Sequence, residues 1–439
     1  MIKGKQNPIR SRGLKIRNRF SHIHIFPILL IIFLAFPLSI SPKSILIPMD
    51  MTQTDHLRSY GVAYWVLEQG VDVEWLINYK GGSFLFNDFK GARDVCLLRG
   101  VRFEQISSTE VVSIYQTIEE NNMEKIILEK APKVAVYTPP NKEPWDDAVT
   151  LALIYAKITY DKVWDEEVLK GELFKYDWIH LHHEDFTGQY GKFYGSYRNE
   201  EWYKEEVDIN ERMAERLGFK KVWHLKHAVA RDIKHYIEKG GFLFAMCSAP
   251  ITLDIALASE DVDIVDVPFD DDPIDVDYGD KIDFTKTLAF ENFNLEINPM
   301  VYEHSDVDVT KEAQGRGQDT YISLFEFSAK YDPVPTMLTQ NHTPLVKEFL
   351  GQDCGFRRDK VKKSVLIMGE VSGTEETKYI HGNYVEGTFT FLGGHDPEDY
   401  THYVGEPPTR LELHKNSPGY RLILNNVLFP AAKKRKLKT

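Results

Sequence analysis

Cysteine is scarce in this chain of 439 residues. The three cysteines, Cys96, Cys247 and Cys354, are odd in number and far apart, which excludes a disulfide scaffold and a cysteine-rich zinc module. No linker rich in Pro, Gly or Ser divides the chain, which favours one domain or two fused halves. Hydrophobic residues make up 43% and aromatic residues 12% of the sequence, so the chain can bury a large core and most of it is not disordered.

Nucleotide-binding motifs and several hydrolase motifs are also missing. The sequence has no G-x-x-x-x-G-K-[ST], no G-x-G-x-x-G after a strand and no G-x-S-x-G, so no loop is visible that would hold nucleotide phosphates. His-Glu-x-x-His does not occur, which excludes a zincin. From these absences we predict no cofactor, and we assign no residue as a metal ligand.

Charge is distributed unevenly along the chain. The 53 Lys and Arg residues against 66 Asp and Glu give a net charge of −13, but seven basic residues lie within 1–19 and five within 433–438. The body between these ends is therefore strongly acidic. Because affinity for nucleic acids comes mainly from Lys and Arg, we predict no nucleic-acid partner.

The N-terminal segment, residues 1–42, has the pattern of an export signal. A basic stretch precedes an apolar core at 28–36 that prolines bracket and small residues follow. A membrane-spanning helix needs about 20 apolar residues, so we expect a cleaved signal peptide, with an uncleaved anchor as the alternative and the only membrane contact. Either form places the body, residues 43–430, in the periplasm or at the envelope, with a basic tail at 431–439.

The body alternates strand and helix patterns. Short apolar runs that end in turn residues predict strands, and apolar residues at helical spacing predict helices between them. This alternation is typical of βαβ units, so we predict an α/β fold with a mostly parallel sheet flanked by helices. We expect strands at 45–50, 73–79, 134–137, 162–164, 178–182, 242–246, 336–339, 364–368 and 388–392, and helices at 54–69, 146–157, 228–239, 250–258 and 420–427.

An acidic segment at 260–283 holds eleven Asp and Glu residues and a single Lys. It lacks the alternating acids, central glycine and terminal Glu of an EF-hand loop. We interpret it as a solvated loop, with a cation site as the weaker alternative.

Cys247 lies where a predicted strand runs directly into a helix. Sites in parallel α/β sheets lie at the carboxyl ends of strands, and Ala245 and Ala249 leave space on either side of Cys247. This is the arrangement of a nucleophile elbow, and the following helix N-terminus would stabilise a thiolate. A small buried cysteine in a tight turn explains the same pattern, so both interpretations stay open.

Histidines and carboxylates gather at the end of the predicted strand 178–182. Along an extended strand alternate residues share a face, and His with carboxylates can act as bases or bind zinc and iron. We take the cluster as a candidate ligand-binding site, with surface histidines of no function as the alternative. Its members are His180, His182, His183, Glu184 and Asp185.

Two further clusters follow predicted strands. After strand 388–392, two glycines expose His395, with Asp396 and Glu398 beside it. After strand 336–339, Gln340 and His342 could line a cleft, although turn capping explains them nearly as well. We keep all five as candidate site residues.

Eight segments together resemble one family of exported bacterial proteins, many of which carry the label "asparagine synthetase B". They are Met-Asp at 49–50, Gly-Gly-Ser-Phe at 81–84, Trp-Asp-Asp-Ala at 145–148, 180–191, Phe-Ala-Met-Cys-Ser at 244–248, 337–342, 393–400 and 416–426. The resemblance covers nearly everything after residue 45. Genuine asparagine synthetases use an N-terminal Cys and an S-G-G-x-D-S loop for ATP, and this sequence has neither, so we do not expect that activity.

At fold level the family resembles the class I glutamine amidotransferase-like superfamily, which is flavodoxin-like. The resemblance implies Cys247 as nucleophile, His395 as base and Glu398 as the carboxylate that orients it. The chain has Ala-Met-Cys-Ser-Ala at 245–249 where the superfamily has G-x-C-x-G, and its His-Asp-Pro-Glu at 395–398 is one residue longer than the usual H-x-E.

We therefore predict an exported class I amidotransferase-like protein that hydrolyses an amide or ester of an unknown small molecule through a thioester. One alternative is a non-catalytic protein that binds a carbohydrate with the aromatic-rich loop 186–202. A second is a metal-dependent hydrolase built on His180, His182 and Glu184.

Overall fold

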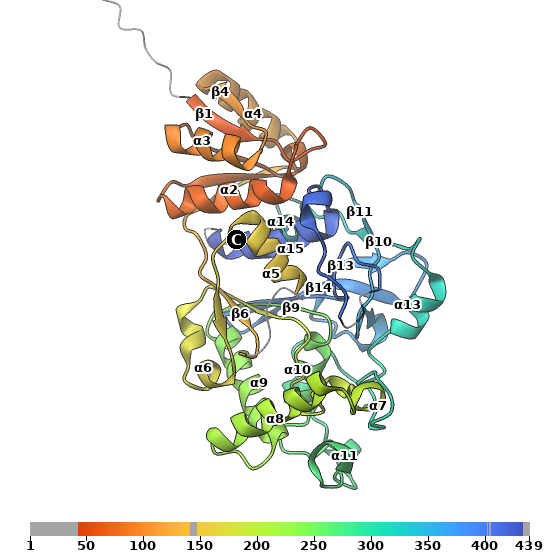
Figure 1. Ribbon diagram of the computed structural model, residues 1–439. Helices are drawn as coiled ribbons and strands as arrows, with labels where there is room; N and C mark the ends of the chain where they lie inside the picture. Colours follow the sequence, from red (N-terminus) through yellow and green to blue (C-terminus); the bar gives the residue numbers. More distant parts are fainter. Residues whose placement is uncertain (1–42, 141–146, 402, 404, 433–439) are drawn as a thin grey trace, which may run out of the picture. The chain divides into compact units, whose positions relative to one another are not determined.

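Two β-sheets organise the residues described by the computed structural model, which are 43–140, 147–401, 403 and 405–432 (Figure 1). The predicted export segment 1–42 and residues 433–439 of the predicted basic tail lie outside the described residues. Within the described ranges, no helix is long and apolar enough to cross a membrane.

The first sheet is antiparallel throughout. Its strands, in spatial order, are β4 (Glu104–Ser107), β1 (Lys43–Ile47), β3 (Ser83–Asn87), β2 (Val73–Ile77) and β5 (Glu124–Leu128).

The second sheet is mixed. Its strands, in spatial order, are β11 (Leu345–Lys347), β10 (Tyr321–Leu324), β13 (Leu366–Val371), β14 (Glu376–Tyr384), β15 (Gly387–Leu392), β9 (Phe242–Met246), β8 (Trp178–Leu181), β6 (Val134–Tyr137) and β7 (Asp161–Val163), while β12 (Phe356–Arg357) pairs with β14. The pairings from β15 to β7 are parallel and the others are antiparallel.

The α/β class is therefore correct, but the prediction of a mostly parallel sheet holds only for the half of the second sheet between β15 and β7. The error has a physical cause in β1. Ile45 and Ile47 enter one core and Leu46 enters another, where it meets Ile114 and Ile118. A strand covered on both faces has a continuous apolar run, whichever way its neighbours run.

Helices form layers on both sides of each sheet (Figure 1). One core joins both sheets to α2, α5 and α15, which lie between them. On the outer faces, α4 packs against the first sheet and α9 and α10 pack against the parallel strands. The longer helices are α2 (His56–Glu68), α3 (Lys90–Arg99), α4 (Ser108–Glu120), α5 (Ala148–Ala156), α8 (Glu201–Arg216), α9 (Val222–Glu238), α10 (Ala249–Ala258) and α15 (Pro418–Leu428).

The predicted strand at 336–339 is wrong. These residues end the short helix α14 (Pro333–Leu338) and its cap, with a proline at the start of the helix. Proline is well suited to the first helical turn, because its fixed φ matches the helix and its missing N–H is not needed there. A four-residue segment with two apolar residues, Met337 and Leu338, is too short for its pattern to separate a buried strand from a buried helix.

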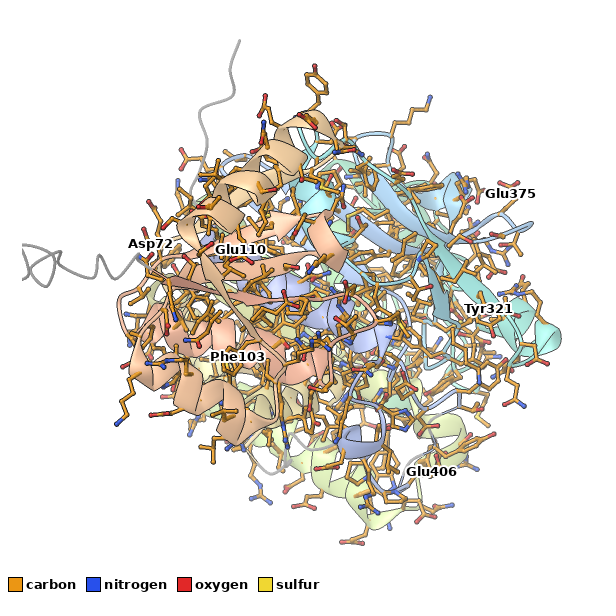
Figure 2. All side chains as sticks on the ribbon, turned by 90° about the horizontal axis from the view of Figure 1, so that it is seen from above. Asp72, Phe103, Glu110, Tyr321, Glu375 and Glu406 are labelled. Carbon is orange, nitrogen blue, oxygen red and sulfur yellow. The ribbon has the colours of Figure 1, made fainter. Side chains whose placement is uncertain are left out.

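The surface of the described chain carries much of the acidic excess. Asp72, Glu110 and Glu375 are exposed, and Figure 2 shows Asp72 and Glu375 near opposite edges of the molecule.

Arg421 of α15 is completely buried and binds loops that follow strands of the first sheet. Its guanidinium donates to the carbonyl oxygens of Met49 (3.0 Å) and Gly81 (2.7 Å), which follow strands of the first sheet. It also lies 3.0 Å from Nδ1 of His342, the residue whose ring stacks on His56 with 4.5 Å between centroids. Arg421 therefore connects α15 to the loops of the first sheet.

Burial and the charge of Arg421 lower the pKa of His56 to about 4 and the pKa of His342 to about 3. In the unfolded chain a histidine has a pKa of about 6.5. Between pH 6.5 and 4 the unfolded chain therefore binds more protons than the folded chain. Stability is complete above pH 6.5 and is lost as the pH falls through this window.

We predict that the free energy of unfolding falls between pH 6.5 and 4, and that His56→Gln removes about 2–3 kcal/mol of that fall, because glutamine does not titrate. Urea unfolding at pH 7, 5.5 and 4.5 measures both slopes. His235→Gln, at an exposed position of α9, is the matched control and should keep the wild-type slope. An equally steep fall in the His56 variant would contradict the assignment.

Candidate active site

The carboxyl ends of four parallel strands bring the candidate residues together. Asp147 follows β6, His182 and His183 follow β8, Cys247 follows β9 and His395 follows β15. Because β6, β8, β9 and β15 are neighbours in the sheet, their carboxyl ends share one edge, as the sequence predicted for the last three of them.

Three histidines, His182, His183 and His395, form what we call the histidine cluster. Each offers a ring nitrogen within 4.8 Å of the others, and Nε2 of His182 lies 3.1 Å from Nδ1 of His395. Two nitrogens bound at about 2.05 Å to one tetrahedral metal ion would be about 3.3 Å apart. The spacing of this pair therefore fits a shared metal ion such as zinc.

Asp147 lies behind the histidine cluster. Its carboxylate is 3.6 Å from Nδ1 of His182 and 3.2 Å from Nε2 of His180, and Nδ1 of His180 lies 3.1 Å from the carbonyl oxygen of Phe244. The same carboxylate caps α5 by accepting from the N–H of Val149 at 2.7 Å. Burial alone would raise the pKa of Asp147, but the charges of His180 and His182 lower it below its usual range.

The end of β8 explains why both His182 and His183 turn toward His395. Strand β8 stops at Leu181, so the alternation of faces expected from 180 to 185 does not continue past it. His180 is on the strand and contacts Asp147 rather than joining the cluster.

The two carboxylates after the histidines have different surroundings. Glu184 accepts from the backbone N–H of His182 at 2.8 Å, and burial raises its pKa to about 7. Asp185 accepts from the backbone N–H groups of Thr187 (2.7 Å) and Gly191 (2.8 Å). Asp185 therefore shapes the loop that follows β8.

Cys247 occupies a strained turn but does not have the expected low-pKa thiol. Its φ of +53° is in the left-handed region, which costs a non-glycine residue energy and is typical of a nucleophile elbow. Its N–H donates to the carbonyl of Gly394 (3.2 Å) and its thiol donates to the carbonyl of Gln352 (3.3 Å). Burial and the carboxylate of Asp353 raise the pKa of the thiol well above its usual range, which disfavours the stabilised thiolate that the nucleophile-elbow interpretation predicts and favours the alternative of a buried cysteine in a tight turn.

The residues after His395 have partners of their own. Oε2 of Glu398 lies 2.7 Å from Nδ1 of His414, and Asp396 accepts from the hydroxyl of Tyr420 at 2.8 Å. Glu398 thus lies against His414, whereas the family resemblance implied that it orients His395.

Gln340 and His342 belong to a different part of the molecule. Gln340 exchanges hydrogen bonds with Asn78, accepting from its backbone N–H and donating to its side chain, both at 2.8 Å. His342 lies beside Arg421. They follow helix α14 rather than a strand of the parallel half. Their partners are Asn78 after β2 and Arg421 of α15, so they do not line the cleft that we predicted.

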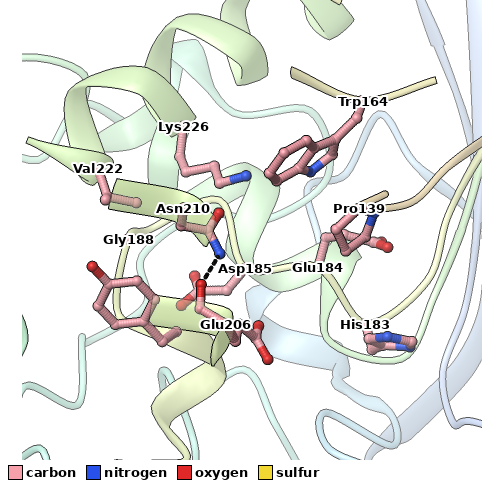
Figure 3. A pocket seen from close by; sticks show the side chains of 11 residues that line it. Pro139, Trp164, His183, Glu184, Asp185, Gly188, Glu206, Asn210, Val222 and Lys226 are labelled. Atoms are coloured by element: carbon pink, nitrogen blue, oxygen red, sulfur yellow. Dashed lines mark hydrogen bonds between the residues drawn. The ribbon is translucent and has the colours of Figure 1, made fainter. Parts of the chain in front are cut away.

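A pocket opens beside His183 (Figure 3). Its volume is about 30 Å³, which is room for about one water molecule, and Glu184 and Tyr190 are on its wall. Another wall is formed by α8, where the side chain of Asn210 donates to the carbonyl of Glu206 at 2.9 Å (Figure 3). The predicted loop 186–202 therefore contributes to a pocket through Tyr190, next to the histidine cluster.

Sequence reasoning missed Asp147, although a usable signal was present. Asp is a common N-cap at the start of a helix. Asp147 lies at the start of the predicted helix 146–157, which follows a predicted parallel strand, so the side chain is expected at the carboxyl edge of the sheet. His304 and Asp353, described below, gave no such signal, because both lie in loops between elements distant in sequence.

We predict that Cys247 reacts slowly with iodoacetamide at pH 7.5 and that Asp353→Asn speeds the reaction several-fold, because the variant removes a carboxylate that disfavours the thiolate. Peptide mass spectrometry separates the three cysteines, and Asp280→Asn, at an exposed acid, is the control. Rapid alkylation of wild-type Cys247 would instead support a nucleophilic thiolate.

Comparisons with known proteins give fold likenesses of low similarity. No protein-family model and no curated protein matches the chain. Among solved structures, the chain is similar to Cytoplasmic Protein STM3548 from Salmonella typhimurium (12% identity, 69% of this chain and 100% of that one, TM-score 0.34) and to Cytoplasmic Protein STM1381 from Salmonella typhimurium LT2 (13%, 69% and 100%, 0.35). It is also similar to Gan42B, a GH42 beta-galactosidase from G. stearothermophilus (9%, 61% and 28%, 0.25). At these TM-scores the likenesses carry no argument about function.

Proposed function

We propose that this protein is a metal-dependent hydrolase of a small molecule and that the histidine cluster holds a single transition-metal ion. The observation that carries the proposal is the convergence of three ring nitrogens within 4.8 Å, with a buried carboxylate behind His182. Imidazole ligands suit zinc, copper, iron and nickel. A carboxylate that binds the second nitrogen of a ligating histidine is the usual support of such sites.

Each residue of the site has a definite task in this proposal. In this proposal the negative charge of Asp147, 3.6 Å from Nδ1 of His182, favours the N–H on Nδ1, which leaves the Nε2 lone pair directed at His395. Glu184 is on the pocket wall next to His183, where its carboxylate can take a proton from a water molecule. A metal ion bound there would polarise the carbonyl group of the substrate and activate a water molecule for attack.

The topology of the parallel strands supports the class I amidotransferase-like assignment. Reading from β7 to β15, the strands stand in chain order 2-1-3-4-5, which is the flavodoxin-like order. In such sheets the ligand binds where the strand order reverses, here between β6 and β8. The pocket is lined by residues that follow β6, β7 and β8, namely Pro139, Trp164 and His183.

A cysteine hydrolase is the second candidate, and one observation favours it. Cys247 has the positive φ of a nucleophile elbow at the end of β9. The raised pKa of its thiol opposes this function. If Cys247→Ala abolished hydrolysis while the metal content stayed constant, the cysteine mechanism would replace the metal mechanism.

We predict about one equivalent of metal per chain after purification and zinc loading, measured by elemental mass spectrometry. His182→Ala and His395→Ala should each lose most of it, because each removes one nitrogen of the cluster. His235→Ala, on the exposed face of α9, is the control. Wild-type protein without stoichiometric metal would refute the proposed function.

We predict that removing the metal with a chelator abolishes hydrolysis in a panel of chromogenic esters and amides, and that zinc, cobalt or manganese restores it. Bound metal without activity on any member would favour the non-catalytic ligand-binding alternative.

We predict that Asp147→Asn weakens metal binding about 10–100-fold, the usual effect of losing a carboxylate behind a ligating histidine. Asparagine caps helices as well as aspartate does, so α5 should keep its start and the melting temperature should change little. Competition with a chromogenic chelator measures the affinity. An unchanged affinity would exclude Asp147 from a role in metal binding.

A further inference from the structure

The loop at 350–354 packs against two elements of the site. The carbonyl of Leu350 accepts from the N–H of His395 at 2.8 Å. Gly351 lies so close to His395 that an added Cβ would be 2.9 Å from the histidine Cβ. The carbonyl of Gln352 accepts from the thiol of Cys247 at 3.3 Å. The position of this loop therefore determines where His395 can lie.

A second loop, after β8, is joined to the first. Asp185, two residues beyond His183, closes this loop by binding the N–H of Gly191. The carbonyl of Gly191 in turn accepts from Nε2 of Gln352 at 2.9 Å. The loops that carry His183 and that support His395 therefore meet at Gln352.

His304 lies between the two loops and is buried completely. Its Nε2 is 3.9 Å from Oδ2 of Asp185, and its Nδ1 is 3.4 Å from Oδ2 of Asp353. Burial opposes a charge on the ring, but the two carboxyl groups raise the pKa of His304 to about 9.

His304 forms an ion pair with Asp185, and the carboxyl group of Asp353 lies on the other side of the ring. All three side chains are buried away from solvent. A charged group there is stable only while its partners stay close, so moving either loop away would leave a buried charge unpaired. The pair thus favours one separation between the loops.

We propose that His304 is a positioning residue that locks the loop after β8 to the loop at 350–354 and so holds His183 and His395 at the separation that one metal ion requires. As far as metal binding is concerned, this inference rests on the proposed function. His304 itself contributes no metal ligand and touches no substrate. It acts through Asp185 on one side and Asp353 on the other.

The test compares His304→Gln, which loses the charge, with His304→Lys, which keeps a cation. We expect His304→Gln to weaken cobalt binding about 10–100-fold and to alter the visible absorption of the cobalt-loaded protein, as loss of an outer support does. His304→Lys should restore part of both. His227→Gln is the matched control, since His227 is also buried but lies beside Glu260.

Asp353→Asn gives a second variant in case His304→Gln does not fold, because it keeps the shape of the side chain. It should weaken cobalt binding in the same direction. If both variants are folded and bind cobalt as the wild type does, with the same absorption spectrum, the inference is wrong.

Histidine ring NMR of the metal-free protein separates this inference from the proposed function. His304→Gln should shift the ring signals of His183 and His395 and leave His235 in place, and His304→Lys should reverse the shift. A wild type that binds no metal but shows these shifts would refute the metal site and keep the positioning role. Unshifted signals would refute the positioning role whether or not metal binds.

Discussion

The site depends on one buried carboxylate, that of Asp147, which lies between His180 and His182. A carboxylate away from water must have partners, and this one has two imidazoles and the first turn of α5. Because Nδ1 of His182 lies on the side of Asp147, Nε2 of the same ring faces His395. The proposed metal site at the carboxyl ends of the strands therefore depends on the buried negative charge of Asp147, which is stabilised by partners after β6 and on β8.

The rest of the fold places this carboxylate and its partners. Parallel pairing from β15 to β7 aligns the strand ends, and helices pack on both faces of these strands. Arg421 connects the first sheet to α15 by binding Met49 and Gly81. In the same helix, the neighbouring Tyr420 binds Asp396, next to His395. A change at the junction of the sheets can thus reach the site through two adjacent residues of one helix.

The sequence was sufficient to predict features that depend on local pattern. The α/β class, the strands of the parallel half and the position of Cys247 at a strand–helix turn follow from apolar periodicity, and His182, His183 and His395 were found because each follows a predicted strand. Strand direction in the first sheet was not predictable, because Ile45, Leu46 and Ile47 are buried on both faces. The partners of Glu398 and His342, and the role of His304, depend on contacts between segments far apart in the sequence. Export and the hydrolysis of an amide or ester remain predictions from the sequence.

The central claim is that three histidines bind one metal ion, and X-ray absorption spectroscopy of the zinc-loaded protein tests it most directly. Imidazole nitrogens bind zinc at about 2.0–2.1 Å and a thiolate binds at about 2.3 Å. The account predicts a first shell of nitrogen and oxygen at the shorter distance, with the outer-shell scattering of about three imidazoles. A sulfur neighbour at the longer distance, or a spectrum without imidazole scattering, would contradict it.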